Sequence, residues 1–175
     1  MFKGFFYIRR LTYIALVVIT ALPVYFFFIN RYIKKKRVKQ FINRTVLLGY
    51  LTVIIYFTLI TKRPQNERLI NFTPFWSYGK FFEVDYQWQI YMNILLFLPL
   101  GFLLPLTTDK MKGWFVVVFA IILSSMIEAT QFFLQLGLCE FDDVFHNALG
   151  AWIGYLYCRF GKWLSSYALR RFTGE

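Results

Sequence analysis

Five apolar segments dominate this sequence and restrict the folds that the chain can adopt. They lie at residues 11–29, 45–60, 90–106, 114–136 and 144–161. A helix that crosses the hydrocarbon core of a bilayer needs about 20 predominantly apolar residues. The composition agrees, because 58% of the residues are hydrophobic and only 17% are charged, unlike an average soluble domain. The sequence therefore predicts an all-α, polytopic integral membrane protein with about five transmembrane segments.

The third segment, residues 90–106, contains Pro99 and Pro105 and allows two interpretations. Proline removes a backbone hydrogen bond, so the segment could be a kinked helix or a re-entrant hairpin. Non-helical backbone at that depth must be buried in protein or line a water-filled cavity. The sequence leaves both alternatives open.

Basic residues predict the orientation, because lysine and arginine beside transmembrane helices tend to stay in the cytoplasm. The first ten residues hold only Lys3, Arg9 and Arg10, whereas the loop after the first segment holds Arg31, Lys34, Lys35, Lys36, Arg37, Lys39 and Arg44. We therefore expect the N-terminus outside and the C-terminus inside. The net charge of +11 suits anionic lipid headgroups, and its dispersal among membrane flanks argues against nucleic-acid binding.

Polar side chains within the apolar segments form the candidate site. A carboxylate in lipid is costly and usually marks a functional position. Glu128, Gln131 and Gln135 are spaced to share one face of the fourth helix, in its outer half. Glu140, Asp142 and Asp143 are expected to fill a short outer connector.

Topology brings further polar residues toward the same place. Asn147 is expected to open the fifth helix, Asn93 to start the third segment and Asn71 to lie in an outer loop. Four parts of the chain are then expected to converge at the outer membrane surface. The aromatic stretch from Trp76 to Trp88 is expected to lie in the membrane interface.

Each of these features also has a purely structural interpretation. Glu128 and Gln131 could be a hydrogen-bonded pair that joins helices. Asp142 or Asp143 could cap the fifth helix, where carboxylates bind free backbone N–H groups. The spacing of Gly150 and Gly154 is typical of a close helix packing face.

Four elements in this sequence resemble those of the VanZ-like family of bacterial membrane proteins. They are INFTPF at residues 70–75, NILLFLPLGF at 93–102, SMIEATQ at 125–131 and DVFHNALG at 143–150. The resemblance divides the chain into an N-terminal transmembrane segment with a basic cytoplasmic loop (1–44), a VanZ-like membrane domain (45–162) and a basic C-terminal tail (163–175).

The resemblance implies a role at the cell envelope, in the bacterial cytoplasmic membrane, because the family's namesake is associated with reduced susceptibility to the lipoglycopeptide teicoplanin. It does not imply an established reaction. The family's polar positions correspond to Asn71, Asn93, Glu128, Gln131, Asp143 and Asn147. Many relatives carry an arginine shortly before the acidic pair, where this chain has Leu138 and Cys139, so its ligand could differ.

Two classes of function fit these residues. In an enzyme acting on an outer-leaflet, lipid-linked substrate, Glu128 and Asp143 are the catalytic candidates, as acid or base and as orienting carboxylate. In a non-catalytic protein, the same residues would engage a membrane lipid, a wall precursor or a lipoglycopeptide. Asn71, Asn93, Gln131 and Asn147 are then the candidate binding residues. A transporter is a third class, disfavoured because the sequence contains no internal repeat.

A divalent cation is a candidate cofactor, since Glu140, Asp142 and Asp143 supply oxygen ligands close together in the sequence. Carboxylate oxygens suit Mg²⁺ or Ca²⁺ better than a softer metal. The sequence does not predict which metal, if any, is bound, nor the oligomeric state.

Overall fold

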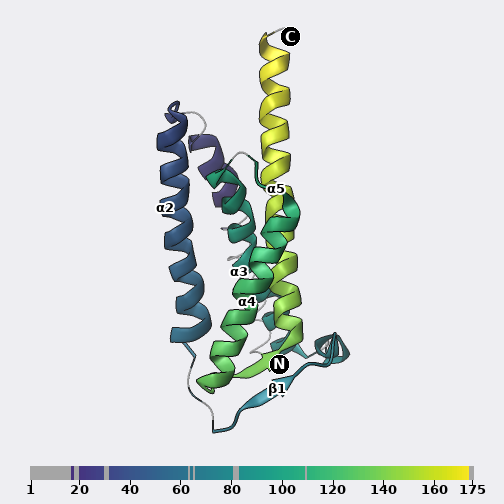
Figure 1. Cartoon of the computed structure of the whole chain (residues 1–175). Helices are drawn as coiled ribbons and strands as arrows, with labels where there is room; N and C mark the ends of the chain where they lie inside the picture. Colours follow the sequence, from purple (N-terminus) through teal and green to yellow (C-terminus); the bar gives the residue numbers. More distant parts are fainter. Residues whose placement is uncertain are drawn as a thin grey trace.

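The computed structural model describes residues 17, 20–29, 32–62, 64, 66–80, 83–108 and 110–173 as a helical bundle with a short strand pair at one end (Figure 1). After a helix at Thr20–Ile29, the elements are α2 (Lys36–Ile55), the π-helical turn η1 (Tyr56–Ile60), β1 (Leu69–Asn71), the 3₁₀ helix η2 (Trp76–Lys80), α3 (Val84–Thr107), α4 (Gly113–Phe133), β2 (Leu138–Glu140) and α5 (Phe141–Thr173). The predicted all-α fold is confirmed.

Three helices in the described part of the chain are long and apolar enough to cross a membrane. They are Lys36–Ile60, Asp85–Thr107 and Gly113–Phe133. Of the predicted first segment, 11–29, the structure describes only residue 17 and residues 20–29. Lys3, Arg9, Arg10 and Arg31 also lie outside the described residues. The third segment is one continuous helix through Pro99 and Pro105, which excludes the re-entrant hairpin.

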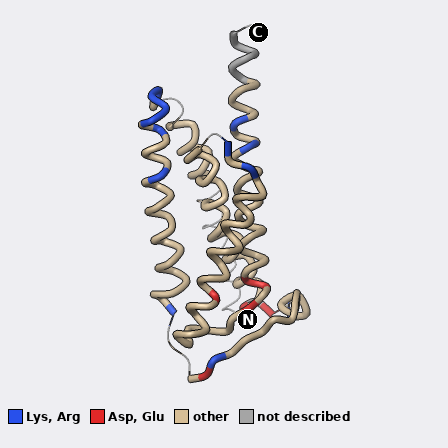
Figure 2. Tube along the Cα trace, in the orientation of Figure 1, with Lys and Arg blue, Asp and Glu red and all other residues tan. Residues whose placement is uncertain are grey.

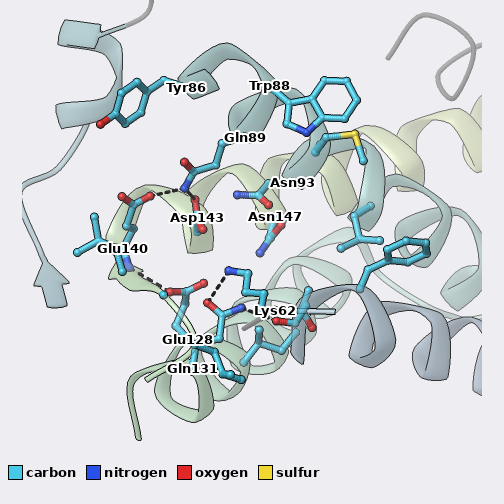
Figure 3. A pocket seen from close by; sticks show the side chains of 18 of the residues that line it. Lys62, Tyr86, Trp88, Gln89, Asn93, Glu128, Gln131, Glu140, Asp143 and Asn147 are labelled. Atoms are coloured by element: carbon cyan, nitrogen blue, oxygen red, sulfur yellow. Dashed lines mark hydrogen bonds between the residues drawn. The ribbon is translucent and has the colours of Figure 1, made fainter. Parts of the chain in front are cut away.

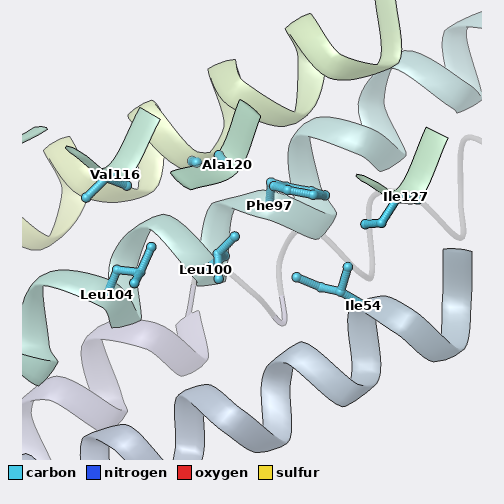
Figure 4. Close-up of a cluster of buried hydrophobic side chains, with 8 residues drawn as sticks. Ile54, Phe97, Leu100, Leu104, Val116, Ala120 and Ile127 are labelled. Carbon is cyan, nitrogen blue, oxygen red and sulfur yellow. The ribbon is translucent and has the colours of Figure 1, made fainter. Parts of the chain in front are cut away.

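The core surrounds α3, the most buried of these three helices. Its main cluster takes side chains from four helices (Figure 4): Ile54, Phe97, Leu100, Leu104, Val116, Ala120, Ile127 and Ala151. In a membrane the lipid tails are as apolar as these side chains, so packing and shape complementarity hold the helices together.

Glycines allow α3 and α5 to lie very close to each other. A Cβ atom added at Gly150 would overlap the Ile94 carbonyl, and one added at Gly154 would overlap the Leu98 carbonyl. From the other side, a Cβ at Gly101 would overlap the backbone of Ala151. The predicted packing role of Gly150 and Gly154 is therefore confirmed, since only hydrogen fits at these positions.

Polar side chains complete the hydrogen bonding of the proline-containing α3. The Tyr50 hydroxyl donates to the Leu96 carbonyl at 2.8 Å, one turn before Pro99. At the last turn of α3, Asn43 Nδ2 donates to the Leu106 carbonyl at 2.7 Å and Lys162 Nζ to the Pro105 carbonyl at 2.8 Å. The bonds to Leu106 and Pro105 satisfy carbonyls that a helix end leaves without partners.

The opposite end of the bundle, which we call the strand end, is organised by β1 and β2. The two strands are parallel, and their register pairs Leu69 with Leu138 and Asn71 with Glu140. This pairing carries the loop before α3 underneath the ends of α4 and α5 (Figure 1). Glu140 therefore lies in a strand, whereas the sequence predicted an irregular connector.

Asp142 holds the loop that follows β1. Its Oδ1 accepts the Phe75 N–H at 2.6 Å, and its Oδ2 accepts the Ser77 N–H at 3.0 Å and the Ser77 hydroxyl at 2.5 Å. The turn places Phe75 at a φ of 59°, in the left-handed region. The predicted helix-capping role of Asp142 is wrong, because its carboxylate binds a distant segment.

Candidate functional site

A cavity of about 1330 Å³ opens at the strand end between α2, α3, α4 and the start of α5 (Figure 3). It combines two kinds of wall. Apolar side chains from α2, η1 and α3 line one part, including Val53, Phe57 and Leu96. Polar side chains line the other part, among them Lys62, Gln89, Asn93, Glu128, Gln131, Glu140, Asp143 and Asn147.

Three buried carboxylates share the polar wall, with exposed fractions of 4% at Glu128, 3% at Glu140 and 7% at Asp143. Glu128 Oε2 accepts the Glu140 backbone N–H at 3.0 Å, which ties α4 to β2. The Gln89 Nε2 donates to the Glu140 carboxylate and, at 3.0 Å, to Asp143 Oδ1. One amide from α3 therefore binds two acids (Figure 3).

Burial changes the acidity of Glu140, the carboxylate on β2. Loss of solvation, followed by the nearby charge of Asp143, raises the pKa of Glu140 from an ordinary 4.5 to about 7, although the Gln89 hydrogen bond acts in the opposite direction. Both causes disfavour the charged form. Glu140 therefore exchanges a proton near neutral pH.

Lys62 brings a positive charge to the same cavity. Its Nζ donates to Gln131 Oε1 at 3.1 Å, while Gln131 Nε2 donates to the Thr58 carbonyl at 2.9 Å. Thr58 belongs to the π-helical turn that ends α2, and such turns often occur at functional sites. Gln131 thus positions Lys62 through a neutral amide.

Two asparagines from neighbouring helices face the cavity with unused hydrogen-bonding atoms. Asn147 is 4% exposed, and its Nδ2 donates to Ser124 Oγ at 2.8 Å. Its Oδ1 and the Nδ2 of Asn93 are both buried without a hydrogen-bond partner. Such atoms normally have a partner, because burying them unpaired costs about 1–3 kcal/mol.

Aromatic side chains line the cavity where α3 begins. Trp76 and Tyr86 pack edge to face with ring centroids 5.4 Å apart. Lys80 Nζ lies 5.5 Å from the Trp76 centroid and 5.0 Å from that of Tyr86. Trp88 also lines the cavity. These rings come from the stretch that the sequence assigned to the membrane interface.

The structure brings most of the predicted site residues together. Those lining the cavity are Asn93, Glu128, Gln131, Glu140, Asp143 and Asn147. Asn71 does not line it; its Oδ1 accepts the Thr73 N–H at 3.0 Å within the loop. Asn147 lies in the second turn of α5, not at its start, because the helix begins at Phe141.

The fourth helix is shorter than the sequence predicted. It ends at Phe133, and Gln135 follows with a φ of 56°, so it does not share the helix face of Glu128 and Gln131. The three candidate metal ligands also diverge, because Asp142 binds the loop while Glu140 and Asp143 face the cavity. The described residues contain no group of three or more His, Cys, Asp or Glu side chains that could hold a metal ion.

Lys62 and Gln89, which make hydrogen bonds in the polar wall, were not predicted from the sequence. Lys62 follows an apolar segment, where a cation is usually interpreted as a topology signal. Gln89 precedes the third segment among aromatic residues. A lysine directly after a transmembrane helix, on the side expected to be outside, was the signal that could have drawn attention to Lys62.

Comparison with known proteins agrees with these motifs. The profile of the family described as VanZ/LLP1 matches residues 45–163. A relative described as "Protein VanZ", from Enterococcus faecium, is 26% identical over 123 residues, which cover 66% of this chain and 72% of the relative. No solved structure matches the chain. Since the family profile spans more than half of the sequence and includes every residue that lines the cavity, the protein belongs to the VanZ/LLP1 family.

Proposed function

We propose that this protein binds the polar head of an amphiphilic envelope molecule, a membrane lipid or a lipid-linked wall precursor, in the cavity at the strand end. This binding lowers susceptibility to lipoglycopeptides such as teicoplanin. One observation carries the proposal: buried carboxylates and amides form one wall of a cavity whose other wall is apolar. A pocket with convergent polar groups and an apolar lining is the usual form of a ligand site.

The proposed site faces the outside of the cytoplasmic membrane. Figure 2 places Lys and Arg mainly at the end of the bundle away from β1, where α2 begins and α3 is joined to α4. Basic flanks favour the cytoplasmic side, so the strand end is the outer end. With the N-terminal segment and α5 counted as spans, the chain crosses five times, N-terminus outside.

Within this proposal the cavity residues have distinct tasks. Glu128 and Asp143 orient the head through charged hydrogen bonds, Asn93 and Asn147 use their free amide atoms, and Gln131 holds Lys62 in place. The test is a teicoplanin susceptibility assay in a strain that lacks the gene, complemented with the wild type or with Asp143→Asn. Wild-type complementation without any change in susceptibility would contradict the proposal.

A catalytic role is the second candidate, favoured by the pKa of Glu140 near 7. A group that exchanges its proton near the working pH is well suited to general acid or base catalysis. In that role the protein would cleave or transfer the polar head of the ligand bound in its cavity. Incubating the reconstituted protein with a lipid-linked wall precursor, and measuring headgroup release by mass spectrometry, separates this role from binding alone.

A further inference from the structure

We infer that the head bound in this cavity is rich in hydroxyl groups, a sugar or polyol on an apolar tail, and that a bare phosphate head is rejected. The inference rests on the proposed function, since it names the chemistry of the amphiphile that the cavity takes. It starts from the hydrogen-bonding atoms that the cavity leaves open.

The acceptors of the cavity exceed its donors. Glu128, Glu140 and Asp143 each present two carboxyl oxygens, and each group already accepts one hydrogen bond from the protein. The remaining lone pairs accept further hydrogen bonds where the group is ionised. The buried Asn147 Oδ1 is a further acceptor without a partner. A ligand that fills this wall must therefore supply several N–H or O–H groups.

Donors are nevertheless present, so the ligand must also accept hydrogen bonds. Asn93 Nδ2 and Trp76 Nε1 are buried without partners, and both residues line the cavity. Lys62 Nζ has three protons and donates one to Gln131. These donors line the same cavity as the carboxyl groups. One ligand must therefore both donate hydrogen bonds to the carboxyl groups and accept hydrogen bonds from these donors.

Hydroxyl groups meet both requirements, because each one donates one hydrogen bond and accepts up to two. A phosphate that carries no hydroxyl only accepts at neutral pH and would face three carboxylates, with Lys62 as the opposing cation. An ammonium head only donates, which would leave Asn93 Nδ2 and Trp76 Nε1 unpaired. A neutral polyhydroxyl head avoids both penalties.

The rest of the cavity fits a sugar joined to an apolar chain. Trp76, Tyr86 and Trp88 supply aromatic rings beside the polar wall, and flat rings pack well against the C–H face of a sugar ring. Val53 of α2 and Phe57 of η1 line the cavity and are 39% and 55% exposed. In a bilayer this apolar side meets lipid, which gives an attached tail a continuous path.

The experiment measures which head binds. The protein is extracted with a styrene–maleic acid copolymer, because alkyl maltosides carry the proposed chemistry, and is transferred to phosphatidylcholine nanodiscs. Native mass spectrometry then follows binding of four probes with equal tails: monoglucosyl-dioleoylglycerol, dioleoylphosphatidic acid, a dioleoyl primary amine and dioleoylglycerol. We expect the glucosyl lipid to bind about tenfold more tightly than the others, from roughly two additional hydrogen bonds. Dodecyl maltoside should displace it and free glucose should not.

Variants link the preference to the asparagines. Asn93→Leu should weaken glucosyl-lipid binding several-fold while dioleoylglycerol binding stays the same, and Asn147→Leu should do likewise if it remains folded. Gln87→Leu is the matched control, because Gln87 lies on α3 six residues before Asn93 but outside the cavity lining. Unchanged selectivity in Asn93→Leu would overturn the role of the amides.

The outcomes also separate this inference from the proposed function. Equal or tighter binding of phosphatidic acid, or of the amine, would overturn the hydroxyl-rich head and leave a lipid-binding cavity in place. If none of the four probes binds saturably to the folded protein in nanodiscs, both the hydroxyl-rich head and the proposed function are overturned.

Discussion

Glu140 and Asp143 share one hydrogen-bond donor, the side-chain amide of Gln89, although the two acids belong to different elements. Two carboxylates so close together resist ionising at the same time. The Gln89 amide reduces that repulsion and fixes β2 and the first turn of α5 against α3. The acidity of this pair and the stability of the strand end are therefore connected.

The connection predicts how stability depends on pH. Because the pKa of Glu140 is about 7 in the folded protein and 4.5 ordinarily, the folded state binds a proton more tightly than the unfolded state. The free energy of unfolding therefore falls as pH rises from about 4.5 to 7. Glu140→Gln should flatten this dependence in melting curves recorded between pH 5 and 8.

Glu67→Gln provides the control for that measurement, since Glu67 is exposed on the loop before β1. Its melting curves should keep the wild-type pH dependence. An equally steep loss of stability in Glu140→Gln would assign the effect to another group.

Glu128→Gln tests whether the intramembrane carboxylate acts through its charge. Glutamine keeps an oxygen that can accept the Glu140 N–H, so membrane abundance and melting temperature should stay close to wild type. Any resistance phenotype should be lost. Glu128→Leu removes the acceptor and leaves the Glu140 N–H unpaired, at a cost of about 1–3 kcal/mol. Wild-type resistance in Glu128→Gln would show that Glu128 only joins α4 to β2.

Asp142 should behave as a structural residue, in contrast to Asp143. Asp142→Ala removes the acceptors of three hydrogen bonds to Phe75 and Ser77, and we expect a loss of several kcal/mol, at about 1–3 kcal/mol for each buried donor left unpaired. Asp143→Asn should lose function while keeping its melting temperature, because the amide oxygen still accepts from Gln89. The measurements are thermal melts and susceptibility assays on both variants. If Asp142→Ala kept its melting temperature and Asp143→Asn lost stability, Asp143 would be the structural residue.

The α3–α5 contact predicts a sharp difference between glycines. Gly154→Ala places a methyl group against the Leu98 carbonyl and should cost more than about 2 kcal/mol, because two backbones must separate. Gly49→Ala is the matched control, with no atom within 4 Å of the added Cβ. In the middle of α2 it should be neutral or stabilise by about 0.5–1 kcal/mol. Equal melting temperatures for the two variants would contradict the close packing.

Orientation is tested with an impermeant thiol reagent on intact cells. In a background with Cys139 replaced, Asn66→Cys on the strand-end loop should be labelled and Lys36→Cys at the start of α2 should not. Labelling of Lys36→Cys alone would place the cavity on the cytoplasmic side and remove the basis for action on outer envelope molecules.

The convergence of polar residues was predictable because it follows from chain direction. Consecutive transmembrane helices run antiparallel. One end of the bundle therefore holds the start of the third apolar segment, the end of the fourth and the start of the fifth. Asn93, Glu128 and Asp143 each lie near such an end. The glycine pattern was predictable for a related reason, since helical periodicity determines which side chains share a face.

The strand pair and its loop could not be predicted in this way. β1 and β2 have three residues each, which is too short for a periodic signal, and their partners are more than sixty residues apart. The contacts of Asp142 with Ser77 and of Lys62 with Gln131 depend on that long-range folding. Local patterns offered Asp142 or Asp143 as a helix cap, because a carboxylate at the start of a helix commonly binds its free N–H groups.

The glycine contact also determines which wall of the cavity can move. Asn93 and Asn147 each lie within one turn of the place where Gly150 meets Ile94, so α3 and α5 hold the two amides as one rigid body. Only 11% of the most apolar stretch of the α2 span is buried inside the protein, against 61% of the corresponding stretch of α3. Separating α2 from the bundle would therefore disrupt less packing than separating α3 from α5, so the α2 side is the wall of the cavity that widens at the lower cost.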